Sequence, residues 1–127
     1  MIIGISSKFD FGRWNHNVYA FDNESAAEKW LNTEEYDFRE RELFGEERMK
    51  DAVKLAGIEP VMTAIYGREP TMPELWKELR KVYGLTQAEL SAITEIAMRS
   101  IQNWESGSRT APDYMLGLVE CKLSDME

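Results

Sequence analysis

The chain has 127 residues, 43% of them hydrophobic and 30% charged, which indicates one or two small domains with packed cores and excludes a wholly disordered chain. The net charge of −8 at pH 7 argues against a general nucleic-acid coat protein, because such proteins carry a strong positive charge. The longest apolar runs fall far short of the roughly 18 residues that cross a membrane, so the sequence predicts no contact with a membrane.

The first part of the chain, residues 1–67, predicts a small α+β domain of two or three strands with helices on one face. Three apolar runs bounded by turn-forming residues are the predicted strands: Ile2–Ser6, Val18–Phe21 and Val61–Tyr66. Residues 9–17 contain glycine and asparagine and are predicted to form the loop between the first two strands.

Helices are predicted between the second and third of these strands. Asp22 or Asn23 can cap a helix whose apolar side chains, from Ala26 to Leu31, share one side. A charged helical stretch is expected from about residue 34 to residue 56, and Gly57 is suited to end it. Because the charges in 34–48 alternate in sign, this run is expected to be a solvated helix face or, failing that, a partner-binding surface.

A domain boundary is predicted at Gly67–Pro70, where glycine and proline occur together. Residues 71–123 then predict an all-α domain of four or five helices, one of them at about residues 97–105 and the last beginning at Pro112. Two pairs have the spacing of a capping box, in which side chain and backbone of the two residues bond reciprocally: Thr71 with Glu74, and Thr86 with Glu89.

This helical region carries fixed residue types at fixed spacing: Leu85-Thr-Gln-Ala-Glu-Leu90, Ile96, Ser100-Ile101 and Trp104-Glu105-x-Gly107-x-Arg109-x-x-Pro112. With this pattern, residues 75–119 resemble the helix-turn-helix domain of phage repressors, the Cro/Xre type. The resemblance implies a domain that binds double-stranded DNA and lays its third helix, here about residues 97–105, in the major groove. Residues 1–67 resemble no known family, and they are expected to bind a partner or to form a dimer.

The resemblance also implies roles for single side chains. Those expected to read base edges are Met98, Arg99, Gln102 and Asn103. Those expected to bind phosphates are Gln87, Ser108 and Arg109. Those expected to be structural are Arg80, Trp104 and Glu105, with Trp104 in the core and Arg80 bridged to Glu105 between the first and third helices. Arginine suits guanine, asparagine and glutamine suit adenine, and Met98 offers only apolar contact, for example to a thymine methyl group.

Three residues depart from the family pattern. Thr94 stands where leucine is usual, Glu95 where glycine marks the turn, and Ala97 where serine or proline opens the helix. A non-glycine residue at positive φ costs about 1 kcal/mol, so we expect a reshaped turn in which Thr94 takes over the cap. Glu95 also places a negative charge near the DNA, and the angle of the third helix stays open.

Together these features favour a transcriptional regulator, in particular a dimeric repressor, because one helix-turn-helix reads too few base pairs to specify a genomic site. The alternative is an antitoxin-like protein, whose N-terminal domain binds a partner protein while its C-terminal domain autoregulates its promoter. A third interpretation is a domain kept for protein contacts alone, which the acidic composition would permit.

The sequence does not predict an enzyme, because it contains only one histidine and one cysteine. His16 lies near Asp10 and Arg13 in a predicted loop, where a single histidine rarely takes part in catalysis. One histidine and one cysteine provide no zinc-ligand spacing and no internal disulfide, so no metal and no cofactor are expected. The lone Cys121 is consistent with the cytoplasm, and we expect its thiol to be buried in an apolar helix and inert.

Overall fold

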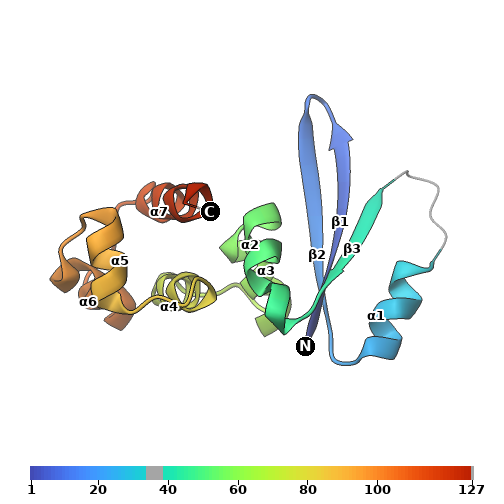
Figure 1. Ribbon diagram of the computed structural model, residues 1–127, viewed down its shortest axis with the longest axis horizontal. Coiled ribbons are helices and arrows are strands. Elements are labelled where there is room, and N and C mark those ends of the chain that lie inside the picture. Colours follow the sequence, from blue (N-terminus) through green and yellow to red (C-terminus); the bar gives the residue numbers. More distant parts are fainter. Residues whose placement is uncertain (34–38, 127) are drawn as a thin grey trace. The chain divides into compact units, whose positions relative to one another are not determined.

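A three-stranded antiparallel sheet forms the centre of the first part of the structure, a computed structural model that describes residues 1–33 and 39–126. Strands β1 (Ile2–Asp10) and β2 (Arg13–Phe21) form a hairpin, and β3 (Glu40–Phe44) pairs with the other side of β1, so the strand order is β2-β1-β3 (Figure 1). The two turn residues have positive φ, 51° at Phe11 and 77° at Gly12. This is the type I′ geometry, whose twist matches that of the paired strands.

Helices cover both faces of this sheet (Figure 1). Helix α1 (Glu24–Leu31) packs on the face that carries Gly4, where a Cβ would lie 2.7 Å from the Trp30 ring. Ile3 and Ile5 alternate with Gly4 and point to the opposite face, where they are buried. That face is packed by the helices that follow a short 3-10 turn: η1 (Glu46–Arg48), α2 (Met49–Ala56) and α3 (Ile58–Tyr66).

Several predictions for this part are wrong. The loop predicted at residues 9–17 lies mostly within the hairpin strands, and the turn itself is only two residues long. The stretch Glu40–Phe44, predicted to be helical, is β3, whereas Val61–Tyr66, predicted to be a strand, lies in α3. Helices were expected on one face of the sheet, but they cover both. The part of the predicted helix at residues 34–38 lies outside the described residues.

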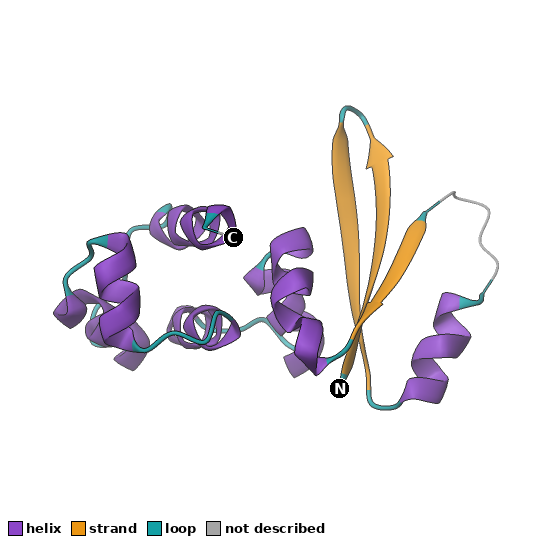
Figure 2. Ribbon diagram, viewed as in Figure 1, coloured by secondary structure: helices purple, strands orange, loops and turns teal. Residues whose placement is uncertain are grey.

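Four helices make up the second part: α4 (Met72–Val82), α5 (Gln87–Thr94), α6 (Met98–Ser106) and α7 (Met115–Asp125) (Figure 2). Both predicted capping boxes are present, at the starts of α4 and α5. The buried apolar side chains of this part come from all four helices: Leu75, Trp76, Leu79, Leu90, Ile101, Leu116, Val119 and Leu123. Short helices of this kind are stable because they share one core.

The chain divides into two compact units, Met1–Arg68 and Glu69–Glu127. An α+β unit followed by an all-helical unit confirms the predicted fold class. Two details differ from prediction: the last helix begins at Met115, not at Pro112, and Cys121 is exposed, not buried. Among the described residues, no helix is both long enough and apolar enough to cross a membrane.

Candidate nucleic-acid interface

The turn between α5 and α6 is fixed by hydroxyl groups of α5. Thr94 Oγ1 donates to the carbonyl of Leu90 at 2.7 Å and accepts from the backbone N–H of Ile96 at 3.4 Å. Ser91 Oγ donates to the carbonyl of Ile96 at 2.6 Å. These bonds tie the chain that leaves α5 back onto α5, which sets the direction in which α6 begins.

The expectation of a reshaped turn is wrong. Glu95 adopts φ 60°, the left-handed conformation that glycine would provide in the family that this segment resembles. Ala97 is the N-cap of α6 and makes no side-chain hydrogen bond there. Thr94 therefore does not cap α6. The turn keeps its geometry at the energetic cost of a non-glycine residue at positive φ.

The inner side of α6 is anchored by an ion pair. Arg80 of α4 donates from Nε and from NH2 to the two carboxylate oxygens of Glu105, each at 2.9 Å, and from NH1 to the carbonyl of Leu85 at 3.0 Å. Glu105 is only 4% exposed. The hydrogen bonds that Arg80 donates to Glu105 raise the pKa of Arg80 above its usual value. One guanidinium thus holds α4, the segment before α5, and α6, in a bidentate geometry that fixes orientation as well as distance.

Two neighbouring side chains complete this inner side. Ile101 is fully buried. Trp104 is only half-buried, and its ring centroid lies 4.8 Å from that of Trp76, which is 1% exposed. The structure therefore corrects the expectation that Trp104 lies in the core and places it at the margin, against a tryptophan that does lie there.

The outer side of α6 carries the side chains expected to read bases. Met98, Arg99 and Gln102 are exposed and Asn103 is half-buried. Met98 and Gln102 are four residues apart, as are Arg99 and Asn103, so the four share one broad face of the helix. Arg99 and Asn103 border a shallow hollow together with Arg109, Ala97 and Ser100. Three of the predicted DNA-contacting residues are thus brought together.

The turn after α6 brings Arg109 to this hollow. Gly107 adopts φ 84° at the C-cap of α6, and the backbone N–H of Arg109 then donates to the carbonyl of Asn103 at 3.3 Å. Ser108 Oγ lies 2.8 Å from Ser106 Oγ, which in turn lies 3.2 Å from the carbonyl of Asn103. The Ser108 hydroxyl is therefore already engaged in closing the helix end.

Gln87 is the first residue of α5 and is half-buried. The first turn of a helix offers backbone N–H groups that can bind a phosphate. Here Glu89 accepts a hydrogen bond from the N–H of Thr86 at 3.0 Å, and these backbone and side-chain bonds from Thr86 lower the pKa of Glu89. A phosphate at this helix end would lie near a carboxylate, unlike one at the hollow beside Arg99 and Arg109.

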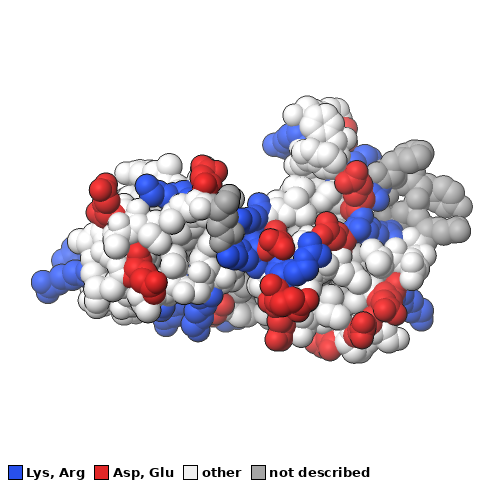
Figure 3. Space-filling model, viewed as in Figure 1, with Lys and Arg blue, Asp and Glu red and all other residues white. Residues whose placement is uncertain are grey.

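Charge is mixed over the rest of the surface. On the face drawn in Figure 3, acidic and basic side chains are interspersed on each unit. Residues 80–112 contain four basic and three acidic side chains, so this segment is close to neutral although the chain is acidic. Two of the four basic side chains in this segment, Arg99 and Arg109, are exposed and border the same hollow.

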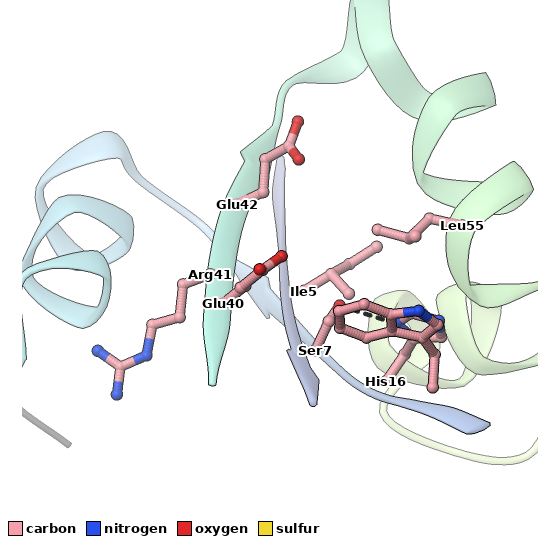
Figure 4. A pocket seen from close by; sticks show the side chains of 8 residues that line it. Ile5, Ser7, His16, Glu40, Arg41, Glu42 and Leu55 are labelled. Atoms are coloured by element: carbon pink, nitrogen blue, oxygen red, sulfur yellow. Dashed lines mark hydrogen bonds between the residues drawn. The ribbon is translucent and has the colours of Figure 1, made fainter. Parts of the chain in front are cut away.

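A second hollow lies on the sheet of the first unit (Figure 4), where sequence reasoning predicted no site. It is lined by Ile5, Ser7, Trp14, His16, Glu40, Arg41, Glu42 and Leu55. Ser7 Oγ and His16 Nδ1 are 2.7 Å apart, and burial together with the charge of Arg39 lowers the pKa of His16. Ile5 and Ser7 are two residues apart, so they share one face of a strand. The sequence predicted a loop and not a strand at residues 9–17, and it therefore did not place Trp14 and His16 beside them.

Comparison with known proteins bears on the second unit. No curated protein and no solved structure matches the chain. Residues 77–120 match a family model described as helix-turn-helix. The match spans α5, the turn and α6, together with the second half of α4 and the first half of α7. Members of that family are DNA-binding regulators, not enzymes. The segment 77–120 is therefore a helix-turn-helix domain of the Cro/C1 type, and it supports assignment of the chain as a DNA-binding transcription regulator.

Proposed function

We propose that this protein is a sequence-specific transcriptional repressor that binds DNA as a dimer and reads the major groove with α6. The observation that carries the proposal is the shared hollow of Arg99, Asn103 and Arg109 on the outer side of α6. The inner side of the same helix is held by the bidentate pair of Arg80 and Glu105. A helix whose inner side is held by packing and whose outer side is polar can present side chains to base edges in a defined orientation.

We divide the side chains into those that read the base sequence and those that bind phosphates and so position the domain on the DNA. Arg99 can donate two hydrogen bonds to O6 and N7 of a guanine, and Asn103 or Gln102 can bond both donor and acceptor of an adenine. Met98 offers an apolar contact to a thymine methyl group. Arg109 follows the helix and is exposed, so we assign it to phosphate, with Ser108 and Gln87 as weaker phosphate ligands.

The weak positive charge has a consequence for affinity. Phosphate contacts provide most of the affinity of basic proteins and make it steeply dependent on salt. With four basic and three acidic side chains in residues 80–112, this protein depends more on base contacts and on engaging two half-sites. A dimer bound across a promoter would then repress by occupying it.

The test uses the full chain and a DNA site selected from a random library, with binding measured at several salt concentrations. Arg99→Ala should weaken binding by about 1–3 kcal/mol and relax the preference at one base pair. Arg109→Ala should weaken all sequences about equally and lower the salt slope by about 1 per half-site. Lys77→Ala, which removes an exposed positive charge from α4, is the matched control and should change neither quantity appreciably.

Two results would count against this proposal. If the Arg99 and Arg109 variants behave alike, α6 does not separate base contact from phosphate contact. If neither variant differs from the Lys77 control, the outer side of α6 does not touch DNA, and a domain kept for protein contacts would be the better interpretation.

A further inference from the structure

The two edges of the sheet differ in how they are protected. The strand order β2-β1-β3 leaves β2 and β3 at the edges, and an edge strand offers unpaired N–H and C=O groups to any other strand. The strand β3 has five residues, and three of them are charged: Glu40, Arg41 and Glu42. The strand β2 has nine residues, and after Arg13 it contains no charged side chain and no proline. Only β3 has the features that normally prevent edge pairing.

The hairpin geometry shows which groups of β2 face outward. In an antiparallel pair, residues alternate between those bonded to the partner strand and those whose N–H and C=O point away. The two-residue turn is closed by the pair Asp10 and Arg13. Counting from it, the outward groups belong to Trp14, His16, Val18 and Ala20. Within the described part of the chain, the strand partner of β2 is β1 alone.

We propose that β2 is the dimerisation surface of this protein and that it pairs antiparallel with β2 of a second copy, joining two sheets into one of six strands. Centred on Asn17, this pairing places Trp14 opposite Ala20 of the partner subunit and His16 opposite Val18 of the partner subunit. A large side chain then lies opposite a smaller one, and no two like charges meet. Such a contact is isologous, which is the requirement for a closed two-fold dimer.

The same operation at the other edge is unfavourable. A two-fold pairing of β3 centred on Arg41 would oppose arginine to arginine and Glu40 to Glu42, and like charges opposite each other destabilise a sheet. On β2, burial and the charge of Arg39 lower the pKa of His16 from 6.5, which favours its neutral form. The charge pattern therefore selects β2 as the edge that can pair with its own copy.

Aromatic side chains beside this edge are exposed in the single chain. Trp14 is 50% exposed, Tyr19 43% and Phe9 57%, and the rings of Phe9 and Trp14 lie 5.5 Å apart between centroids. Tryptophan and tyrosine are enriched among the residues that dominate binding energy at protein interfaces. Pairing of the two β2 strands would cover the Trp14 and Tyr19 side chains that border the edge.

This inference supplies the dimer of the proposed function, but it concerns the first unit only. It can therefore fail while DNA binding stands. The test measures the oligomeric state of the full chain by sedimentation equilibrium without DNA. We expect a dimer at micromolar concentration. Asn17→Lys places two lysines opposite each other at the two-fold axis, and it should raise the dimer dissociation constant about tenfold or more.

The matched control is Asn32→Lys, which adds the same charge at an exposed site beside the opposite edge, where Arg41 donates to the carbonyl of neighbouring Thr33. This variant should dimerise like the natural chain. Thermal melting and circular dichroism of both variants show that each is folded. A monomeric natural chain, or equal dimerisation of the two variants, would overturn the proposal and leave the first unit to another protein, as an antitoxin-like role requires.

A cross-linking experiment tests the register without destabilising the strand. At the two-fold axis, two Asn17 residues form a pair without mutual hydrogen bonds, whose Cα atoms lie about 4.5 Å apart, within the range that a disulfide spans. In a Cys121→Ser background, Asn17→Cys should form an intermolecular disulfide on mild oxidation. Glu40→Cys on β3, where residue 40 is also exposed, should not. Cross-linking at residue 40 and not at residue 17 would contradict the proposal.

Discussion

Glu95 is one of two non-glycine residues with positive φ in the described chain, the other being Phe11. Its left-handed conformation costs about 1 kcal/mol relative to glycine, and it lies in the turn that precedes α6, the helix proposed to meet DNA. Glu95→Gly should therefore raise the free energy of unfolding by about 1 kcal/mol and should not weaken DNA binding. Urea unfolding and a binding titration measure the two effects. A less stable variant would mean that the Glu95 side chain makes a contact worth more than the strain.

Arg80 and Glu105 permit a second prediction about single residues. Arg80→Met leaves the carboxylate of Glu105, 4% exposed, without its cationic partner, and this should lower the free energy of unfolding by about 3 kcal/mol. The double variant Arg80→Met with Glu105→Leu removes both charges and should recover most of that loss, because apolar side chains can replace a buried pair. Urea unfolding of the single and double variants provides the measurement. Equal losses in both would show that the pair acts through packing alone.

The two sides of α6 could be predicted from the sequence because the resemblance to phage repressors implied the outer positions, and the apolar Ile101 marked the inner side. Residues three and four apart share a helix face, which groups Arg99 with Gln102 and Asn103 and separates them from Ile101. The position of Cys121 could also have been read this way: Leu116, Val119 and Leu123 form the buried stripe of α7, and residue 121 lies about 200° around the helix from residue 119. The apolar character of α7 as a whole obscured this stripe.

Thr86 allows a prediction about the start of a helix. Its hydroxyl accepts from the backbone N–H of Glu89 at 3.1 Å, and Thr86→Ala should lower the free energy of unfolding by about 1 kcal/mol. Because bonds from Thr86 lower the pKa of Glu89 in the folded state, that carboxylate stabilises the fold above its unfolded pKa. The contribution is lost as pH falls through the lower, folded value.

The measurement for Thr86 combines unfolding with titration. In Thr86→Ala the pKa of Glu89 should move part of the way back toward 4.5, because the backbone N–H of residue 86 remains as a donor. Carboxyl chemical shifts followed by NMR against pH report that pKa directly. Thr71→Ala, at the other capping box, should lower stability similarly and leave the pKa of Glu89 where it is. A change at Glu89 in this control would show that the two helix starts are coupled.

The elements of the second unit could be predicted because their ends are marked locally. A capping box begins α4 and α5, and glycines at positive φ end α4 and α6. The first unit offers fewer local signals. Glu40–Phe44 contains good helix formers and becomes a strand only because β1 is available to pair with it, which overrides intrinsic preference.

Two further errors in this unit have different causes. The prediction of a strand at Val61–Tyr66 conflicts with the helical spacing of Ile58, Val61, Met62 and Ile65, the first three of which are buried in α3. The hairpin turn was missed because Phe11-Gly12 replaces the usual asparagine-glycine or aspartate-glycine pair. A phenylalanine at positive φ is strained, so no sequence rule favours it there. The first error was avoidable from spacing, whereas the second was not.

At the scale of the whole molecule, the two proposed surfaces lie on different units. The helix α6 belongs to the unit that begins at Glu69, and β2 belongs to the unit that ends at Arg68. Two half-sites bound by one dimer turn the second binding event into an intramolecular one, which raises the overall affinity without any new contact. Changes at the two surfaces should therefore affect DNA binding in different ways.

A palindromic site and a single half-site separate these effects. The natural chain should bind the palindrome about 100-fold more tightly than the half-site. Asn17→Lys should reduce that ratio while leaving affinity for the half-site at the level of Asn32→Lys, which carries the same added charge. Arg99→Ala should weaken both sites, the palindrome by about twice the free energy lost at the half-site, because two copies of the contact are removed. Fluorescence anisotropy at fixed salt provides the affinity of each of these chains for the palindrome and for the half-site. If Asn17→Lys keeps the full ratio, the dimer that binds DNA forms through another surface; if Arg99→Ala lowers only the ratio, Arg99 belongs to the subunit contact and not to the groove.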